Sequence, residues 1–236
     1  YPPGDGIEPL RQAVAAHQHR FYGIDVDPEE EILVTAGASE ALAAALIALV
    51  EPGDEVVTFE PYYDFYAAAI AMAGGQRRVV TLNVPDYSFD PDELVAAVGP
   101  STRMILLNSP HNPTGKVFDT EELSSIAKVS IENDLLVVTD EVYEHLVFDG
   151  ASHVPIATLP GMAERTIRIG SAGKTFSMTS WKVGYLTAAP KLMSLIAKAH
   201  QFLVFTTPSN LQRAVAHGLD NEQHWYTNLA VGLQAK

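Results

Sequence analysis

Hydrophobic positions in the first 50 residues alternate between a helical and a strand-like spacing. Residues 6–23 place apolar side chains on one helical face, at Ile7, Leu10, Val14 and Phe21. A short β-rich run at 31–35 follows, and residues 40–50 are apolar enough for a mostly buried helix. This part of the chain therefore predicts a helix, a strand and a second helix.

The same alternation continues to the end of the chain. Apolar, β-branched runs predict strands at 55–59, 77–82, 103–110, 135–141, 166–170 and 183–189. Helical spacing predicts helices at 63–75, 90–98, 119–134, 190–204 and over most of the remaining residues. Local signals mark the helix ends: Pro61 to open a helix, Gly74 and Gly75 to end it, Asp90 as an N-cap, and a capping box that starts at Asp119 or Thr120.

Strands that alternate with helices five or six times indicate an α/β architecture. Several strands are continuous Val, Ile and Leu runs, as expected when helices cover both faces of a mainly parallel sheet. We therefore expect residues 1–236 to form one domain, a mainly parallel sheet flanked by helices. Ligands bind such sheets at the carboxyl ends of the strands. The segments at these ends are 35–39, 59–63, 108–115, 139–143 and 169–174.

Composition narrows the classes of function. The formal net charge is -14 and no lysine or arginine cluster stands out, so nucleic acid is not an expected partner. The longest apolar run, "ALAAALIALV", is too short to span a membrane. The absence of cysteine excludes disulfides and thiolate metal sites, no metal site is predicted, and a cytoplasmic location is favoured. The chain opens on "YPPGDGIEPL" without Met and stops within a helical pattern, so we expect an internal stretch of a longer protein.

Lys174 lies in "SAGKTFSMTSWKVGY", directly after a predicted strand, and three roles are open to it. It could close a phosphate-binding P-loop, act as a covalent nucleophile, or be an ordinary solvated side chain. A P-loop needs a glycine six residues before its lysine, and that position is Arg168. The sequence therefore disfavours the ATPase interpretation.

A covalent lysine indicates pyridoxal phosphate, because an amine that forms an imine needs an electron sink. This cofactor requires a carboxylate at its pyridine nitrogen, donors at its phenolate oxygen, and hydroxyl, backbone and cationic groups at its phosphate. Asp140 ends one strand, Tyr143 follows it by three residues, and Asn112 lies at the end of another strand. Each has a simpler alternative: Asp140 could cap a following helix, Tyr143 could pack in the core, and the Asn-Pro pair could be a turn.

The other predicted strand ends offer partners for the phosphate and the ring. Hydroxyl, cationic and exposed backbone groups for the phosphate are available at Ala38, Ser39, Ser171 and Lys182. Tyr62 and Tyr63 follow a strand and could cover a flat ring or simply pack. Each feature alone is common in proteins. Their joint occurrence at strand ends favours a cofactor site around Lys174.

Three segments resemble the signature segments of class I/II aminotransferases, the fold-type I pyridoxal-phosphate enzymes: "NSPHNPTGKVF", "VVTDEVYEHLVFDG" and "SAGKTFSMTSWKVGY". The resemblance runs from Tyr1 to the end of the chain. Within the family, "EPYYDFY" looks like the kynurenine/glutamine branch, and "YPPGDGIEPLR" looks like the actinobacterial N-succinyldiaminopimelate branch. The resemblance implies the pyridoxal-phosphate-binding large domain, without the small C-terminal domain that carries the arginine for the substrate carboxylate.

The resemblance also implies a role for each candidate residue. Lys174 would hold the cofactor as a Schiff base and move a proton between the substrate α-carbon and the cofactor C4′, and Asp140 would pair with the pyridinium nitrogen. The ring partners would be Asn112 and Tyr143 at the phenolate oxygen and Tyr63, or else Tyr62, against the ring face. The phosphate partners would be Ala38, Ser39, Ser171, Lys182 and, from the neighbouring subunit of a homodimer, Tyr1.

The expected function is therefore amino-group transfer between an amino acid and a 2-oxo acid. The pair N-succinyl-LL-2,6-diaminopimelate and 2-oxoglutarate is one candidate. A kynurenine/glutamine-type aminotransferase, a cysteine-conjugate β-lyase or a decarboxylase would share the same cofactor residues. A non-catalytic domain that uses the cofactor site to sense an effector is a further alternative.

Overall fold

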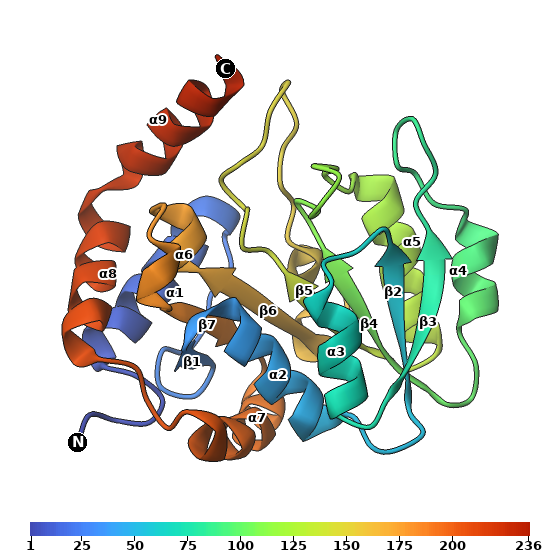
Figure 1. Cartoon of the computed structure of the whole chain (residues 1–236), viewed down its shortest axis with the longest axis horizontal. Coiled ribbons are helices and arrows are strands. Elements are labelled where there is room, and N and C mark those ends of the chain that lie inside the picture. The colour runs from blue at the N-terminus through green and yellow to red at the C-terminus, as the bar shows by residue number, and fades with distance from the viewer.

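Seven strands form one mixed sheet in the order β1-β7-β6-β5-β4-β2-β3 (Figure 1). The structure is a computed structural model and describes residues 1–236. The strands are β1 Ile32–Thr35, β2 Glu55–Glu60, β3 Gln76–Thr81, β4 Thr102–Asn108, β5 Leu136–Asp140, β6 Thr166–Ser171 and β7 Gly184–Thr187. The pairs β2–β3, β2–β4, β4–β5 and β5–β6 are parallel, whereas β7 is antiparallel to both β6 and β1. The predicted α/β fold with a mainly parallel sheet is confirmed.

Nine α-helices surround the sheet. They are α1 Glu8–Tyr22, α2 Gly37–Leu49, α3 Phe65–Met72, α4 Pro91–Ala97, α5 Thr120–Glu132, α6 Ala172–Thr175, α7 Pro190–Leu203, α8 Ser209–Asn221 and α9 Gln223–Gln234. The last of these, α9, extends away from the body of the molecule toward the C-terminus (Figure 1). None of these helices combines the length and the apolar character that a membrane-spanning helix requires.

Both faces of the sheet are buried, as the continuous apolar strand runs predict. Met104 and Leu106 of β4 belong to the apolar layer formed with α2, α3 and α7. Ile105 and Leu107, which alternate with them, belong to the layer formed with α4 and α5. A third apolar cluster joins α1 and α8 to β1 and β7 at one end of the sheet.

Strand direction determines which segments meet at the functional edge. Because β7 runs antiparallel to both of its neighbours, β1 points the same way as β6. The carboxyl ends of β1, β2, β4, β5 and β6 therefore lie at one edge of the sheet, together with the amino end of β7. This geometry brings residues 35–39 and 182–184 to the same edge as 171–174.

Local helix signals are confirmed at two helices and wrong at a third. The Asp90 side chain accepts the Asp92 N–H at the start of α4, and Asp119 forms a complete capping box with Glu122 at the start of α5. The prediction that Pro61 opens a helix is wrong, because α3 begins four residues later. The segment 61–64 is instead free to reach the functional edge.

Two further expectations need correction. Ile7, Leu10 and Val14 are buried, but Phe21 is 40% exposed at the end of α1, where its ring packs beside Tyr226 of α9. The helix that Asp140 could have capped does not form, since residues 141–147 are turns and irregular backbone. Asp140 therefore does not serve as the cap of a following helix.

Candidate active site

One cavity at the carboxyl edge of the sheet gathers nine of the ten predicted site residues. They are Ala38, Ser39, Tyr63, Asn112, Asp140, Tyr143, Ser171, Lys174 and Lys182. The cavity holds about 790 Å³ of empty space, open solvent included. Its lining comes from segments spread over more than 140 residues of sequence, which meet because their strands end at the same edge.

Lys174 enters this cavity from α6, the single helical turn that follows β6. Its Nζ lies 5.5 Å from the centre of the Tyr143 ring. The P-loop alternative does not fit, because Arg168 is buried in β6 and engaged by two glutamates instead of forming part of an open loop. The Lys174 side chain is half-buried and lines the cavity, where it faces the other candidate residues.

Asp140 is a buried carboxylate at the end of β5. Tyr66 Oη donates a hydrogen bond to its Oδ2 over 2.8 Å, and the Val142 N–H lies 3.3 Å from its Oδ1. Burial raises the pKa of Asp140, and the hydrogen bond from Tyr66 opposes this effect. A cationic ligand group beside Asp140 would stabilise the ionised carboxylate in this low-dielectric site. The pyridinium nitrogen of pyridoxal phosphate fits this requirement.

Asn108 connects Asn112 to Asp140, and sequence reasoning missed it. Its Nδ2 donates to the backbone oxygen of Asp140 over 2.7 Å, and its Oδ1 accepts the Asn112 N–H over 2.7 Å. One buried amide thus fixes the ends of β4 and β5 relative to each other. Tyr66, which bonds Asp140 directly, was also missed. Asn108 opens the segment 108–115 and Tyr66 ends "EPYYDFY", but neither was assigned a role, because their partners lie on other strand ends.

The turn between β1 and α2 forms the second wall of the cavity. Gly37 has a φ of 78°, a left-handed backbone that favours glycine, and α2 starts at this residue with unpaired N–H groups. A Cβ on Gly184 would lie 2.6 Å from the carbonyl carbon of Gly37, so only glycine lets β7 approach so closely. Lys182 and Ser171 complete this wall with a cation and a hydroxyl. The donor set suits a phosphate group.

The aromatic candidates separate into different environments. Tyr63 lines the cavity. The Tyr62 ring instead packs under the guanidinium of Arg77, whose central carbon lies 4.1 Å from the centroid of the Tyr62 ring. Tyr1 lies outside the cavity, fully exposed, with its ring edge-on to Phe205 at 6.4 Å. Within one subunit, Tyr1 therefore does not join the other nine residues.

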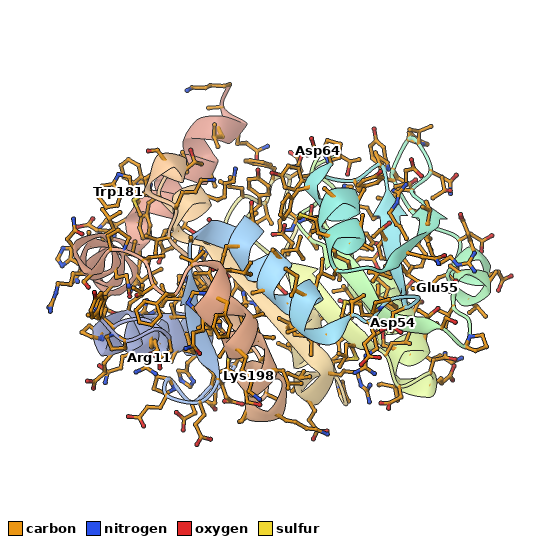
Figure 2. All side chains as sticks on the ribbon, turned by 60° about the horizontal axis from the view of Figure 1, so that its bottom comes forward. Arg11, Asp54, Glu55, Asp64, Trp181 and Lys198 are labelled. Atoms are coloured by element: carbon orange, nitrogen blue, oxygen red, sulfur yellow. The ribbon has the colours of Figure 1, made fainter.

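The segment between the two lysines contributes Thr179 to the cavity, but its tryptophan faces outward. Trp181 lies at the surface close to the last helices, at the opposite end of the molecule from Asp54 and Glu55 (Figure 2). The backbone at Lys182 adopts a left-handed φ of 53°, which ends the 3-10 turn Thr179–Trp181. This turn directs Lys182 back toward the cavity wall.

A buried charge cluster stabilises the segment that carries Asp140 and Tyr143. Arg168 of β6 donates to Glu141 Oε2 through Nε and to Glu144 Oε2 through Nη2, the latter over 2.6 Å. The Tyr22 ring lies 4.5 Å from the guanidinium carbon, and Tyr185 Oη donates to Glu144 Oε1 over 3.3 Å. Because the glutamates belong to the turn that carries Asp140 and Tyr143, the arginine fixes this turn from its far side.

The charge of Arg168 determines how this cluster titrates. Burial alone would raise the pKa of Glu144, but the adjacent guanidinium outweighs it and holds that pKa well below its usual range. Next to Glu144, His17 Nε2 and His145 Nε2 lie 2.8 Å apart, and burial lowers the pKa of His17 to about 4. These two imidazoles and Glu144 have metal-ligand spacing, but they are already hydrogen-bonded to one another or to Arg168.

The fold is that of the large domain of fold-type I aminotransferases, and the chain belongs to the class I and II aminotransferase family. The family profile, described as "Aminotransferase class I and II", matches residues 1–235. Enzymes of this family use pyridoxal phosphate.

Named relatives agree with this assignment. The chain is 50% identical to the "Probable N-succinyldiaminopimelate aminotransferase DapC" of Mycobacterium tuberculosis, over 100% of this chain and 60% of that protein. It is 40% identical to the methionine aminotransferase of Escherichia coli, over 97% and 59% of the two chains. The solved structure of N-succinyldiaminopimelate aminotransferase from Mycobacterium tuberculosis superposes with a TM-score of 0.97 at 49% identity, over 100% of this chain and 62% of that one. The chain thus spans about 60% of the length of these relatives.

Proposed function

We propose that residues 1–236 form the pyridoxal-phosphate-binding large domain of an aminotransferase. The observation that carries this proposal is that Lys174 and the buried carboxylate of Asp140 line one cavity together with phosphate-type donors. Pyridoxal phosphate, when bound, supplies the electron sink for charge that develops on the substrate α-carbon. The protein supplies the positions of the groups around it.

Different side chains bind the cofactor ring and transfer the proton. Asp140 holds the pyridine nitrogen in its protonated form, and Tyr66 and Asn108 hold Asp140 and its strand end in place. The Lys174 amine would hold the cofactor covalently and, as a free amine, would carry a proton to and from the substrate α-carbon. Asn112 and Tyr143 orient the phenolate side of the ring, and their segments are fixed to the same strand ends.

The other lining residues bind the phosphate and the ring face. Tyr63 covers the ring, because Tyr62 is turned toward Arg77. The phosphate is held at the cavity wall by Ala38, Ser39, Ser171 and Lys182. Tyr1 reaches the phosphate of a partner subunit.

The favoured substrates are N-succinyl-LL-2,6-diaminopimelate and 2-oxoglutarate, on the strength of the 50% identity to the Mycobacterium tuberculosis relative of that name. A kynurenine-type aminotransferase is the second candidate, supported by 42% identity to the "Kynurenine--oxoglutarate transaminase" of Dictyostelium discoideum. The cysteine-free composition favours a cytoplasmic location.

We also propose a homodimer with a shared active site. The end of α7 and the loop after it expose four apolar side chains in a row: Phe202, Leu203, Val204 and Phe205, the first of them 86% exposed. This exposed apolar segment lies beside Tyr1. A second copy that covered it would remove apolar surface from water and bring its own Tyr1 toward the cavity.

Borohydride reduction of the purified full-length protein tests the covalent assignment. We expect a visible absorption band that disappears on reduction and a pyridoxyl group fixed on the peptide that contains Lys174. The matched control is Lys182→Met, which should bind cofactor less tightly but still carry the label on Lys174. A label on Lys182 in the wild type would contradict the assignment.

A further inference from the structure

His200 of α7 is 1% exposed, and each of its ring nitrogens faces a hydrogen-bond acceptor. Nδ1 lies 3.0 Å from Glu40 Oε1. Nε2 lies 2.9 Å from the backbone oxygen of Gly4 and 3.0 Å from that of Phe205. Backbone carbonyls and an ionised carboxylate only accept, so all three contacts are hydrogen bonds only if both ring nitrogens carry protons. The geometry therefore selects the charged imidazolium.

Glu40 connects this imidazolium to the proposed phosphate-binding turn. Its Oε1 faces His200, and its Oε2 accepts the Ala36 N–H over 3.1 Å. Ala36 directly precedes residues 37–39, the first turn of α2, and these three residues line the cavity. The Glu40 carboxylate, which is hydrogen-bonded to His200, therefore helps to orient the first turn of α2.

The two carbonyl contacts connect His200 to the opposite side, toward the surface. The Phe205 backbone belongs to the exposed apolar segment 202–205, and its ring packs against Tyr1 at 6.4 Å. Thr206 Oγ1 also donates to the Pro3 backbone oxygen over 3.1 Å. The N-terminal segment and the loop after α7 are therefore held together where His200 donates to both.

We propose that His200, as an imidazolium, is a positioning residue that couples the phosphate-binding turn at 37–39 to the Tyr1 segment and to the exposed apolar segment 202–205. This inference rests on the proposed cofactor site and dimer. Loss of the Nδ1 proton would remove the hydrogen bond to Glu40. Loss of the Nε2 proton would remove the hydrogen bonds to the carbonyls of Gly4 and Phe205. Cofactor retention and subunit pairing then weaken together.

The surrounding charges are consistent with this form. Burial alone would lower the pKa of His200, but the hydrogen bond and charge of Glu40 and the two carbonyls outweigh it and raise that pKa. Asp5, in the N-terminal segment, is paired with Arg11 at 2.9 Å. Lys198, on the same helix, is exposed and points outward (Figure 2). Because the folded pKa is raised, the stabilisation is present below the ordinary histidine pKa and is lost as pH rises through the folded value.

The first experiment needs no cofactor. Histidine ring signals of the full-length protein are followed by NMR against pH, and His200 is assigned by the signal lost in His200→Gln. We expect it to titrate above the ordinary value of about 6.5. In Glu40→Gln its midpoint should fall by about one pH unit, a tenfold change in proton affinity. A wild-type midpoint below 6.5 would overturn the proposal.

The second experiment measures pyridoxal phosphate affinity by equilibrium dialysis, and dimer dissociation by sedimentation, between pH 6 and 9. We expect His200→Gln to bind the cofactor about tenfold more weakly than wild type at pH 6, because it loses a charge-assisted hydrogen bond, and to dissociate more readily into monomers. Above the midpoint measured by NMR the difference should shrink. His19→Gln, which alters an exposed histidine paired with Asp25, is the control and should behave as wild type.

The outcomes separate this proposal from the cofactor assignment. If wild type binds no pyridoxal phosphate, the proposed function fails, and the proposal falls with it even if His200 is found protonated. If wild type binds the cofactor and His200→Gln binds it equally at every pH, only the positioning role is overturned. If His200→Gln does not fold, Glu40→Gln tests the same hydrogen bond between Glu40 and His200. Wild-type affinity of Glu40→Gln for pyridoxal phosphate would then overturn the proposal.

Discussion

Asp140→Asn is expected to lower the rate of amino-group transfer by about 10²–10⁴-fold while the fold stays intact. The substitution removes the buried negative charge that keeps the cofactor nitrogen protonated, and breaking a buried charge pair costs about 3–5 kcal/mol, which converts to this range of rates. The fold should survive because an asparagine oxygen can still accept the hydrogen bond from Tyr66. Single-turnover kinetics and circular dichroism check the two parts.

Glu60→Gln is the matched control. Glu60 ends β2 as Asp140 ends β5, but it is exposed and does not line the cavity. It should transfer amino groups at close to the wild-type rate. Near-native turnover in Asp140→Asn would show that Asp140 is structural and would remove the central carboxylate from the mechanism.

Arg168→Met is expected to destabilise the protein by about 3–5 kcal/mol, because it leaves two buried glutamates without their cation. Urea unfolding followed by circular dichroism measures this loss. The control is Arg78→Met: Arg78 pairs with Glu55 at 2.6 Å, but its side chain is 56% exposed, so its loss should have a much smaller effect. Equal effects of the two substitutions would contradict the role of the buried cluster.

The same cluster predicts a direction for the pH dependence of stability. Burial opposes ionisation of Glu141 and Glu144, but Arg168 prevails and lowers the pKa of both. Their pairing therefore stabilises the fold above the ordinary glutamate pKa, and the stabilisation is lost as pH falls through the lowered folded values. Arg168→Met should consequently lose less stability on acidification than wild type does.

Local signals explain why much of the fold could be predicted from the sequence. The Asp90 cap and the Asp119 capping box involve residues within one helical turn, so sequence alone reveals them. The Val, Ile and Leu runs of β4 and β5 likewise predict buried strands directly. The strand-end rule then places Lys174, Asp140 and Asn112 at one edge, and the cavity confirms that they meet.

Contacts between distant segments explain what the sequence did not reveal. Tyr66 reaches Asp140 across 74 positions, and Gln212 accepts the Ile7 N–H across 205. In the sequence, Arg168 was notable only because it stands where a P-loop would have a glycine. Its ion pairs with Glu141 and Glu144 could not be predicted, because these residues lie more than 20 positions away. The spacing predicted Phe21 on one helical face with Leu10 and Val14, but its ring is 40% exposed and packs against Tyr226 of α9, 205 residues later. Only the folded chain brings such pairs together.

Amino-group transfer by the full-length protein tests the central claim most directly. Purified protein is incubated with panels of amino donors and 2-oxo acids, N-succinyl-LL-2,6-diaminopimelate and 2-oxoglutarate among them, and the products are identified by mass spectrometry. We expect the wild-type protein to form equal amounts of a new amino acid and a new 2-oxo acid, and Lys174→Ala to form neither. Cofactor-loaded protein that releases pyruvate and ammonia from a cysteine conjugate without transferring an amino group, or that turns over no donor at all, would contradict it.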